Sequence, residues 1–248
     1  MRRLISQLLC PPRCAACGKL MAPTLKGTPT CLCAPCREAW EQERVAECPT
    51  CHRLLSECRC VSGLMEKAGV SAHVKLMPYG EGRVIGRLIG AVKRRGTHRA
   101  FTFLAEELRP LVLAAVREAK NETATPPEAV ISFLPRTQEA KRKYGYDQAE
   151  RLARALSKAT GLRFLPLFSR QRAGILQKTL NRRQRVKNTK GAFALRRDVF
   201  GLRVLLVDDV VTTGAGMAEA ARLLYHANAA DVIAVSAALT KKNKDKIN

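Results

Sequence analysis

Residues 204–217 of the sequence, VLLVDDVVTTGAGM, combine an apolar run, two neighbouring acids and a turn of small residues. α/β sheets bind ligands at the carboxyl ends of their strands, and Asp208 and Asp209 directly follow the apolar run 204–207. The turn 212–216 lets backbone amides approach an anion closely, and the start of the next helix adds about half a positive charge. The stretch therefore predicts a strand-turn-helix that binds a phosphate group.

The two adjacent acids need a role of their own, because carboxylates beside a bound phosphate repel it unless they hold another group. Ribose hydroxyls or a Mg²⁺ ion are the groups that such a pair binds well. The turn has no Gly-Lys-Ser/Thr, so it differs from a P-loop. A generic strand-turn-helix without a ligand is the structural alternative.

The chain beyond residue 63 alternates apolar strands with amphipathic helices. Asp147 and Gly161 are expected to cap the two ends of one helix. The expected helices are 84–92, 101–116, 152–159 and 217–224, and the expected strands are 129–134, 204–207 and 232–239. This alternation predicts an α/β fold in which a mostly parallel sheet is flanked by helices.

All ten cysteines lie between Cys10 and Cys60, most of them in close pairs. Residues 1–10 lack the cleavage site of a secretory signal, so metal binding in the cytoplasm is a better interpretation than disulfides. Four thiolates leave no open position on zinc, so the expected sites are structural. The predicted zinc ligands are Cys14, Cys17, Cys33, Cys36, Cys48, Cys51, Cys58 and Cys60.

The two expected zinc sites differ in spacing. The first combines two CxxC turns separated by 15 residues, which fits a zinc ribbon, whereas the second ends in Cys58-x-Cys60 and is a weaker match. His52 is an alternative ligand, the pairs could interleave, and reduced thiols without metal are the alternative for either site. Cys10 and Cys31 are left over. One or two zinc ions would supply most of the folding free energy of this segment, because it offers little apolar core.

The last cysteine marks the expected domain boundary. Residues 61–63 are expected to form a hinge between a zinc-ribbon domain, 1–63, and an α/β domain, 64–240. A polar, disordered tail, 241–248, follows. No apolar run reaches the roughly 18 residues of a membrane span, so no such span is expected.

The sequence is strongly basic, with 44 Lys+Arg against 21 Asp+Glu and a net charge of +23. The basic residues concentrate between Arg163 and Arg203, where Asp198 is the one acid. Such a field attracts polyanions, either nucleic acid or a phosphate-rich small molecule. A basic, well-solvated surface without a partner is the alternative.

The residues 208–215, DDVVTTGA, resemble the motif with which type I phosphoribosyltransferases bind 5-phosphoribosyl-1-pyrophosphate (PRPP). The resemblance implies that Asp208 and Asp209 bind the ribose hydroxyls. It also implies a set of residues around the 5-phosphate, namely Thr212, Thr213, Gly214, Ala215 and the amide of Gly216. At Gly216 that family often has threonine, so this chain lacks one hydroxyl.

With the cysteine-rich segment in front, the chain resembles the ComF/ComFC family of competence-associated phosphoribosyltransferases. The resemblance implies a pyrophosphate loop at 134–136, a basic flexible loop from Arg170 to Phe193, and Mg²⁺ bound together with PRPP. It matches 144–148, YGYDQ, to a family motif in part, with helix packing and capping as the alternative. Phe193 is expected to anchor the loop in the core. The candidate cations for the pyrophosphate leaving group are Arg136, Arg172 and Lys178.

The resemblance and the charge indicate one function and two alternatives. We expect a PRPP-binding protein of DNA uptake in natural transformation that contacts single-stranded DNA and competence-machinery proteins, with phosphoribosyl transfer an open question. Tyr79, Tyr144 and Tyr146 are candidates for stacking on single strands. The alternatives are a nucleobase salvage phosphoribosyltransferase and a catalytically inactive adaptor that senses PRPP. The sequence does not indicate the acceptor or the oligomeric state.

Overall fold

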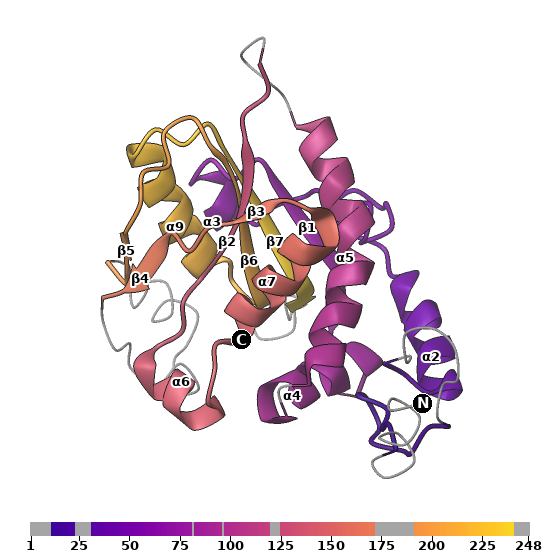
Figure 1. Cartoon of the computed structure of the whole chain (residues 1–248). Helices are drawn as coiled ribbons and strands as arrows, with labels where there is room; N and C mark the ends of the chain where they lie inside the picture. Colours follow the sequence, from indigo (N-terminus) through magenta and orange to yellow (C-terminus); the bar gives the residue numbers. More distant parts are fainter. Residues whose placement is uncertain are drawn as a thin grey trace, which may run out of the picture.

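The structure, a computed structural model, describes residues 11–22, 31–80, 82–95, 97–119, 125–171 and 191–240. Its centre is a five-stranded parallel sheet with the strand order β1-β7-β6-β2-β3 (Figure 1). The strands are β1 (Ala72–Tyr79), β2 (Ala129–Phe133), β3 (Arg163–Phe164), β6 (Arg203–Val211) and β7 (Asp231–Thr240). The predicted α/β fold is confirmed, and β1 is a strand that the sequence patterns did not indicate.

Helices cover both faces of this sheet. They are α2 (Ala34–Arg44), α3 (Gly63–Glu66), α4 (Val84–Arg95), α5 (His98–Glu118), α6 (Gln138–Tyr144), α7 (Gln148–Thr160) and α9 (Ala215–His226). The four predicted helices are present as α4, α5, α7 and α9. A small antiparallel pair, β4 (Phe168–Arg170) and β5 (Phe193–Leu195), lies apart from the main sheet.

Alternation along β6 divides the apolar core into two layers. Leu205 and Val207 pack in the cluster that includes α5 and α7, whereas Val204 and Leu206 pack in the cluster that includes α9. All four side chains are fully buried, as the period-two geometry of a strand covered on both faces requires. In Figure 1, α5 and α7 lie on one side of the sheet and α9 on the other.

Near the carboxyl end of β6, β7 continues to pair with it but β2 does not. β6 pairs with β2 as far as Val207, opposite Phe133, but it continues beside β7 as far as Val211. The chain leaves β2 through Pro135, so residues 208–211 border an open space on that side. The strand is longer than the predicted 204–207, and the two acids lie within it. Open α/β sheets bind ligands at such divergence points.

The expected hinge at 61–63 is packed against the sheet domain. Gly63 begins the short helix α3, and the Ser62 hydroxyl donates to the carbonyl of Thr213 at 3.2 Å. α3 contacts α9, and Met65 within it is fully buried. The domain boundary at 63 stays a prediction, and the predicted tail 241–248 lies outside the described residues.

Among the described helices, none combines the length and the apolar composition that crossing a bilayer requires.

Candidate functional site

A cavity of about 520 Å³ lies beside the open part of β6. It contains every described residue that the sequence predicted for PRPP binding or leaving-group stabilisation. These are Arg136, Asp208, Asp209, Thr212, Thr213, Gly214, Ala215 and Gly216. The other two predicted cations, Arg172 and Lys178, lie outside the described residues. The strand end, the turn and the loop after β2 therefore meet in one place.

Asp209 is the more strongly bound of the two acids. Its Oδ2 accepts a hydrogen bond from the Arg136 guanidinium at 2.8 Å and lies 3.7 Å from the Lys93 ammonium. Burial would raise the pKa of Asp209, but these two cations outweigh that effect and lower it below its ordinary value. Asp209 is thus held as a carboxylate inside the cavity.

Asp208 has the opposite electrostatic setting. Burial, followed by the neighbouring negative charge of Asp209, raises the pKa of Asp208 well above its ordinary value. Its Oδ1 accepts a hydrogen bond from the backbone amide of Asp209 at 2.8 Å. Asp209 is therefore the firmly charged member of the pair. Asp208, whose negative charge is poorly compensated, is stabilised by an added hydrogen-bond donor, so the pair suits two adjacent hydroxyl groups.

Asp147 fixes the loop that carries Arg136. It caps α7 by accepting from the amide of Glu150 at 3.5 Å, and its other oxygen accepts from the amide of Arg136 at 2.8 Å. Lys141 lies 3.5 Å from the same carboxylate, which is 4% exposed. The predicted capping role of Asp147 is confirmed, and the structure adds a role in positioning the loop 134–136.

The turn after β6 has the geometry of an anion-binding helix start. Gly214 is the N-cap of α9 and has a φ of +76°, a left-handed conformation that glycine adopts without strain. The amide of Ala215 bonds to Thr213 Oγ1 at 3.3 Å, so the side chain of Thr213 shapes the turn. A Cβ at Gly216 would lie 3.3 Å from Leu134, which explains why a small residue fits there. The helix amides and dipole of α9 favour a phosphate at this point.

Further cations and aromatic rings line the cavity, and of these the sequence placed only Arg170 near PRPP, at the start of the predicted flexible loop. They are Lys93 at the end of α4, Arg170 at the end of β4, Lys143 and Tyr144 on α6, and Tyr79 at the end of β1. The basic run after residue 92 was a signal for Lys93, but its distance in sequence from Asp209 hid the contact. Tyr146 instead packs, because its hydroxyl donates to the Val92 carbonyl and Arg151 lies over its ring at 4.1 Å.

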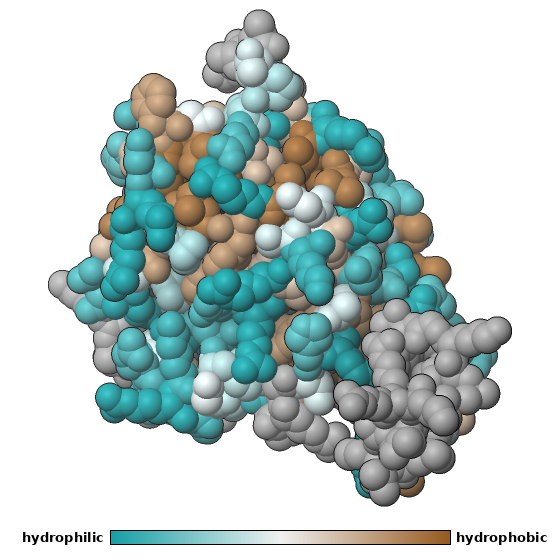
Figure 2. Space-filling view, viewed as in Figure 1, coloured by the Kyte–Doolittle hydropathy of each residue, from teal (hydrophilic) through white to brown (hydrophobic). Residues whose placement is uncertain are grey.

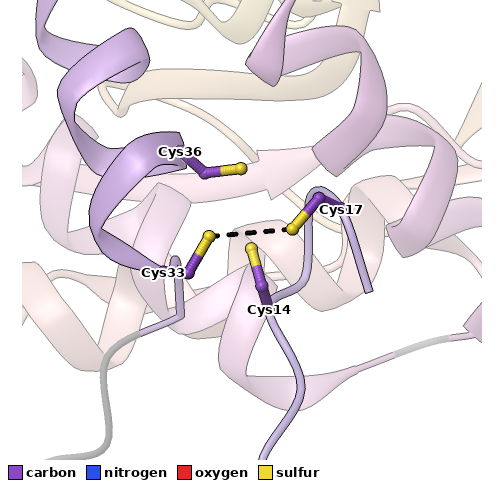
Figure 3. Close-up of side chains that lie close together, drawn as sticks. All are labelled: Cys14, Cys17, Cys33 and Cys36. Atoms are coloured by element: carbon purple, nitrogen blue, oxygen red, sulfur yellow. Dashed lines mark hydrogen bonds between the residues drawn. The ribbon is translucent and has the colours of Figure 1, made fainter. Parts of the chain in front are cut away.

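Four cysteines form a first cluster, a candidate metal site, at the amino-terminal side of α2. Figure 3 shows the sulfurs of Cys14, Cys17, Cys33 and Cys36 directed toward one another. All lie within 4.8 Å, and the Sγ atoms of Cys17 and Cys33 are 3.6 Å apart. Tetrahedral zinc with Zn–S bonds of ~2.3 Å requires sulfurs separated by ~3.8 Å, so this donor set fits zinc.

The second cluster, Cys48, Cys51, Cys58 and Cys60, also has its sulfur atoms within 4.8 Å. The Cys-x-Cys spacing therefore still converges, and the two sets of pairs do not interleave. His52 is not part of the cluster, and it has a positive φ of 58° in the turn. Both clusters could hold zinc ions.

The two clusters begin with the same knuckle. The amide of Cys14 bonds to the carbonyl of Lys19 at 2.8 Å, and that of Cys48 bonds to the carbonyl of Arg53 at 2.8 Å. Burial tends to raise the pKa of Cys14 and Cys48, but nearby backbone amides outweigh it and lower the values to about 7 and about 6. Each cluster thus has one thiol prepared for metal binding as thiolate.

Cys31 is a core residue rather than a ligand. It is 6% exposed, and burial raises the pKa of its thiol to about 12, so it stays protonated. Cys10, the other cysteine left over, lies outside the described residues.

Comparison with known proteins agrees with the resemblance in the sequence. Residues 89–248 match the family model of the phosphoribosyl transferase domain. A DNA utilization protein YhgH from Salmonella typhi is 36% identical over 131 residues, which are 52% of this chain and 57% of the relative. The chain therefore spans little more than half the length of that relative.

Two competence proteins are also similar. Competence protein ComFC from Streptococcus pneumoniae is 25% identical over 235 residues, 89% of this chain and 96% of the relative. Competence protein F from Haemophilus influenzae is 34% identical over 122 residues, 47% of this chain and 53% of the relative.

Proposed function

Because the chain belongs to the phosphoribosyl transferase domain family, and within it to the ComF/ComFC proteins, we propose that the cavity at the end of β6 binds PRPP. The observation that carries this proposal is the convergence of an acid pair, a helix start and Arg136 on one cavity. PRPP has ribose hydroxyls, a 5-phosphate and a pyrophosphate, and the three features can bind these three groups.

Each feature has one task in the proposed complex. Asp208 and Asp209 accept hydrogen bonds from the two ribose hydroxyls, and the turn 212–216 donates amides and hydroxyls to the 5-phosphate. Arg136 faces the pyrophosphate, with Lys93 and Arg170 adding positive charge to the same cavity. The Mg²⁺ ion proposed to accompany PRPP would neutralise further pyrophosphate oxygens when bound.

Transfer, where it occurs, needs no nucleophilic side chain from the protein. An acceptor atom forms a bond to C1 of the ribose while the C1–O bond breaks and pyrophosphate leaves with the electron pair. Arg136 stabilises the charge that develops on the leaving group, and the cavity orients the sugar. Arg172 and Lys178 are proposed to add to this stabilisation from the loop outside the described residues.

Calorimetry with PRPP and Mg²⁺ tests the site. The double variant Asp208→Asn and Asp209→Asn should weaken PRPP binding by about 100-fold or more, since the charge-assisted hydrogen bond of Asp209 and the carboxyl partner that Asp208 offers the other hydroxyl are both lost. Asp198→Asn is the matched control, because Asp198 is an exposed acid that does not line the cavity. Unchanged PRPP affinity in the double variant would show that the assignment is wrong.

We further propose a cytoplasmic role in DNA uptake with contact to single-stranded DNA and to proteins of the competence machinery. The names of the similar proteins and the net charge of +23 support this proposal. Exposed Lys143 on α6 adds positive charge at the cavity, with exposed Arg142 beside it on the same helix, and Figure 2 shows hydrophilic side chains over this part of the surface.

Binding of a single-stranded oligonucleotide across a range of salt concentrations tests the DNA contact. The affinity should fall steeply as salt rises, because basic side chains displace counterions from phosphates. A flat salt dependence would contradict a contact through the basic surface. Release of pyrophosphate with one free nucleobase would instead favour salvage, and PRPP binding without turnover for any base or DNA would favour the adaptor.

A further inference from the structure

The turn that is proposed to hold the 5-phosphate is supported from behind by residues 61–66. The Ser62 hydroxyl donates to the carbonyl of Thr213 at 3.2 Å. A Cβ at Gly214 would lie 2.7 Å from Ser62 Oγ and 3.0 Å from Met65 Cγ. Met65 is fully buried, so this packing is solid rather than a loose surface contact.

The hydrogen bond from Ser62 sets the direction of an amide in the turn. The carbonyl of Thr213 and the N–H of Gly214 belong to one planar trans peptide, so they point in opposite directions. That carbonyl is held by Ser62, which does not line the cavity, whereas Gly214 does line it. The Gly214 N–H is therefore directed toward the place of the 5-phosphate. Without Ser62, this peptide could rotate, because glycine tolerates several conformations.

Residues 61–66 continue directly from the second cysteine cluster. Cys60 precedes Ser62 by two residues, and the backbone between Cys58 and Cys60 is fixed on β1. Lys75 Nζ donates to the carbonyls of Cys58 and Cys60 at 3.3 and 2.9 Å. The amide of His73 also donates to the carbonyl of Arg59, at 3.1 Å.

The charge of Lys75 also favours attachment of the second cluster to β1. Lys75 is 1% exposed, and its ammonium donates to neutral carbonyls, including that of His73 at 3.1 Å. Burying an ammonium costs free energy, and negative charge nearby offsets that cost. Four thiolates around one divalent ion carry a net charge of −2, and the second cluster is the set of anions that Lys75 adjoins. A metal in the second cluster would therefore stabilise Lys75, and both would hold the chain up to Cys60 in place.

We propose that the second cysteine cluster, when it holds its metal, positions the phosphate-binding turn through Ser62, so that Ser62 is a positioning residue for the 5-phosphate. This inference rests on the proposed PRPP site. It assigns the second cluster a role in ligand binding that the first cluster does not share, because the first packs in the core layer of α5, whereas Met65 and the start of α9 pack in the other layer.

The test compares two ligands that report on different parts of the cavity. Calorimetry of the zinc-loaded full chain measures ribose 5-phosphate, which needs the turn, and pyrophosphate, which needs the loop of Arg136. Ser62→Ala should weaken ribose 5-phosphate binding about five-fold, the effect of one hydrogen bond, and leave pyrophosphate affinity unchanged. Ser71→Ala is the matched control, since Ser71 Oγ donates to the Val232 carbonyl at 3.2 Å near the opposite end of the sheet.

The metal is tested with a matched pair of cysteines. Cys51→Ser in the second cluster should weaken ribose 5-phosphate binding at least as much as Ser62→Ala. Cys17→Ser, at the equivalent position of the first knuckle, should leave it unchanged. Equal affinity of Ser62→Ala and the wild type for ribose 5-phosphate would overturn the inference. Equal loss for both ligands would also overturn it, since that pattern reports general destabilisation.

Amide hydrogen exchange separates this inference from the proposed function. Exchange of residues 212–216 should accelerate in Ser62→Ala and in Cys51→Ser but not in Ser71→Ala, with no ligand present. If the wild-type chain bound neither ribose 5-phosphate nor PRPP, the proposed function would fail while this measurement still tested the contact. Unchanged exchange in Ser62→Ala would overturn the positioning role.

Discussion

The two cysteine clusters repeat one knuckle but are attached to the molecule in different ways. The first cluster is part of the main apolar core, through Cys14, Cys36 and the fully buried Trp40. The second forms a small separate cluster with Leu55 and is fixed to β1 by the polar contacts of Lys75. The same metal-binding motif is thus held once by packing and once by hydrogen bonds and charge.

Helix α2 accounts for the attachment of the first cluster. The Trp40 ring contacts Phe103 edge-on at a centroid distance of 4.9 Å, and its Nε1 donates to Glu107 at 3.4 Å. Arg37 and Arg44 reach the same carboxylate at 3.1 and 2.6 Å. The helix therefore joins the first cluster to α5, away from the phosphate-binding turn. We infer that loss of metal from the first cluster and loss of metal from the second affect different parts of the protein.

The largest effect is expected when one metal site is removed. Structural zinc contributes on the order of 10 kcal/mol in small zinc modules, so Cys17→Ser or Cys51→Ser should each lose one of two zinc ions in metal analysis. Trp40 is the single tryptophan of the chain and lies on α2, the helix that carries Cys36 of the first cluster. Its fluorescence should therefore shift to longer wavelength in Cys17→Ser and stay unchanged in Cys51→Ser.

Two results would contradict this comparison. Zinc-free wild-type protein after gentle purification would show that the clusters are not metal sites. The same tryptophan shift in both variants would show that the two clusters unfold as one unit.

A smaller effect is expected at Lys75. Lys75→Met leaves three buried carbonyls without their donor and should lower the free energy of unfolding by about 1–3 kcal/mol. It should also speed zinc transfer from the second cluster to a chromophoric chelator, while the first cluster releases zinc at the wild-type rate. Lys67→Met, at an exposed position, is the control. Equal release from both clusters would contradict the assignment of Lys75 to the second one.

The sequence predicted those elements that are determined by residues close to one another in the chain. The apolar run before Asp208, the cap Asp147 and the stop Gly161 define strands and helices without reference to the rest of the chain, and the structure confirms them. The turn 212–216 was identifiable for the same reason. The cysteine spacing likewise predicted both clusters, although it left the pairing open.

Features that depend on distant contacts were not predictable in this way. β1 is interrupted in sequence by Lys75 and Pro78, and the lysine is buried because of carbonyls that approach it from residues 58–60. Lys93 follows an ordinary amphipathic pattern, and its contact with Asp209 arises from the fold. The contact between the expected hinge 61–63 and the turn was likewise not predictable, since nothing near Ser62 in sequence indicates Thr213.

The smallest effect is expected at a turn position where the first knuckle has glycine and the second has histidine. Gly18 and His52 both follow the second cysteine of a knuckle, and both have positive φ, 78° and 58°. A side chain in the left-handed region costs about 1–2 kcal/mol, so Gly18→Ala should destabilise the first knuckle by about that amount. His52→Gly should be neutral or slightly stabilising, because relief of strain is offset by about 0.5–1 kcal/mol of added chain entropy. The rate of zinc release should therefore rise in Gly18→Ala and stay unchanged or fall slightly in His52→Gly. An equal change of this rate in both variants would show that the two knuckles do not share one backbone geometry.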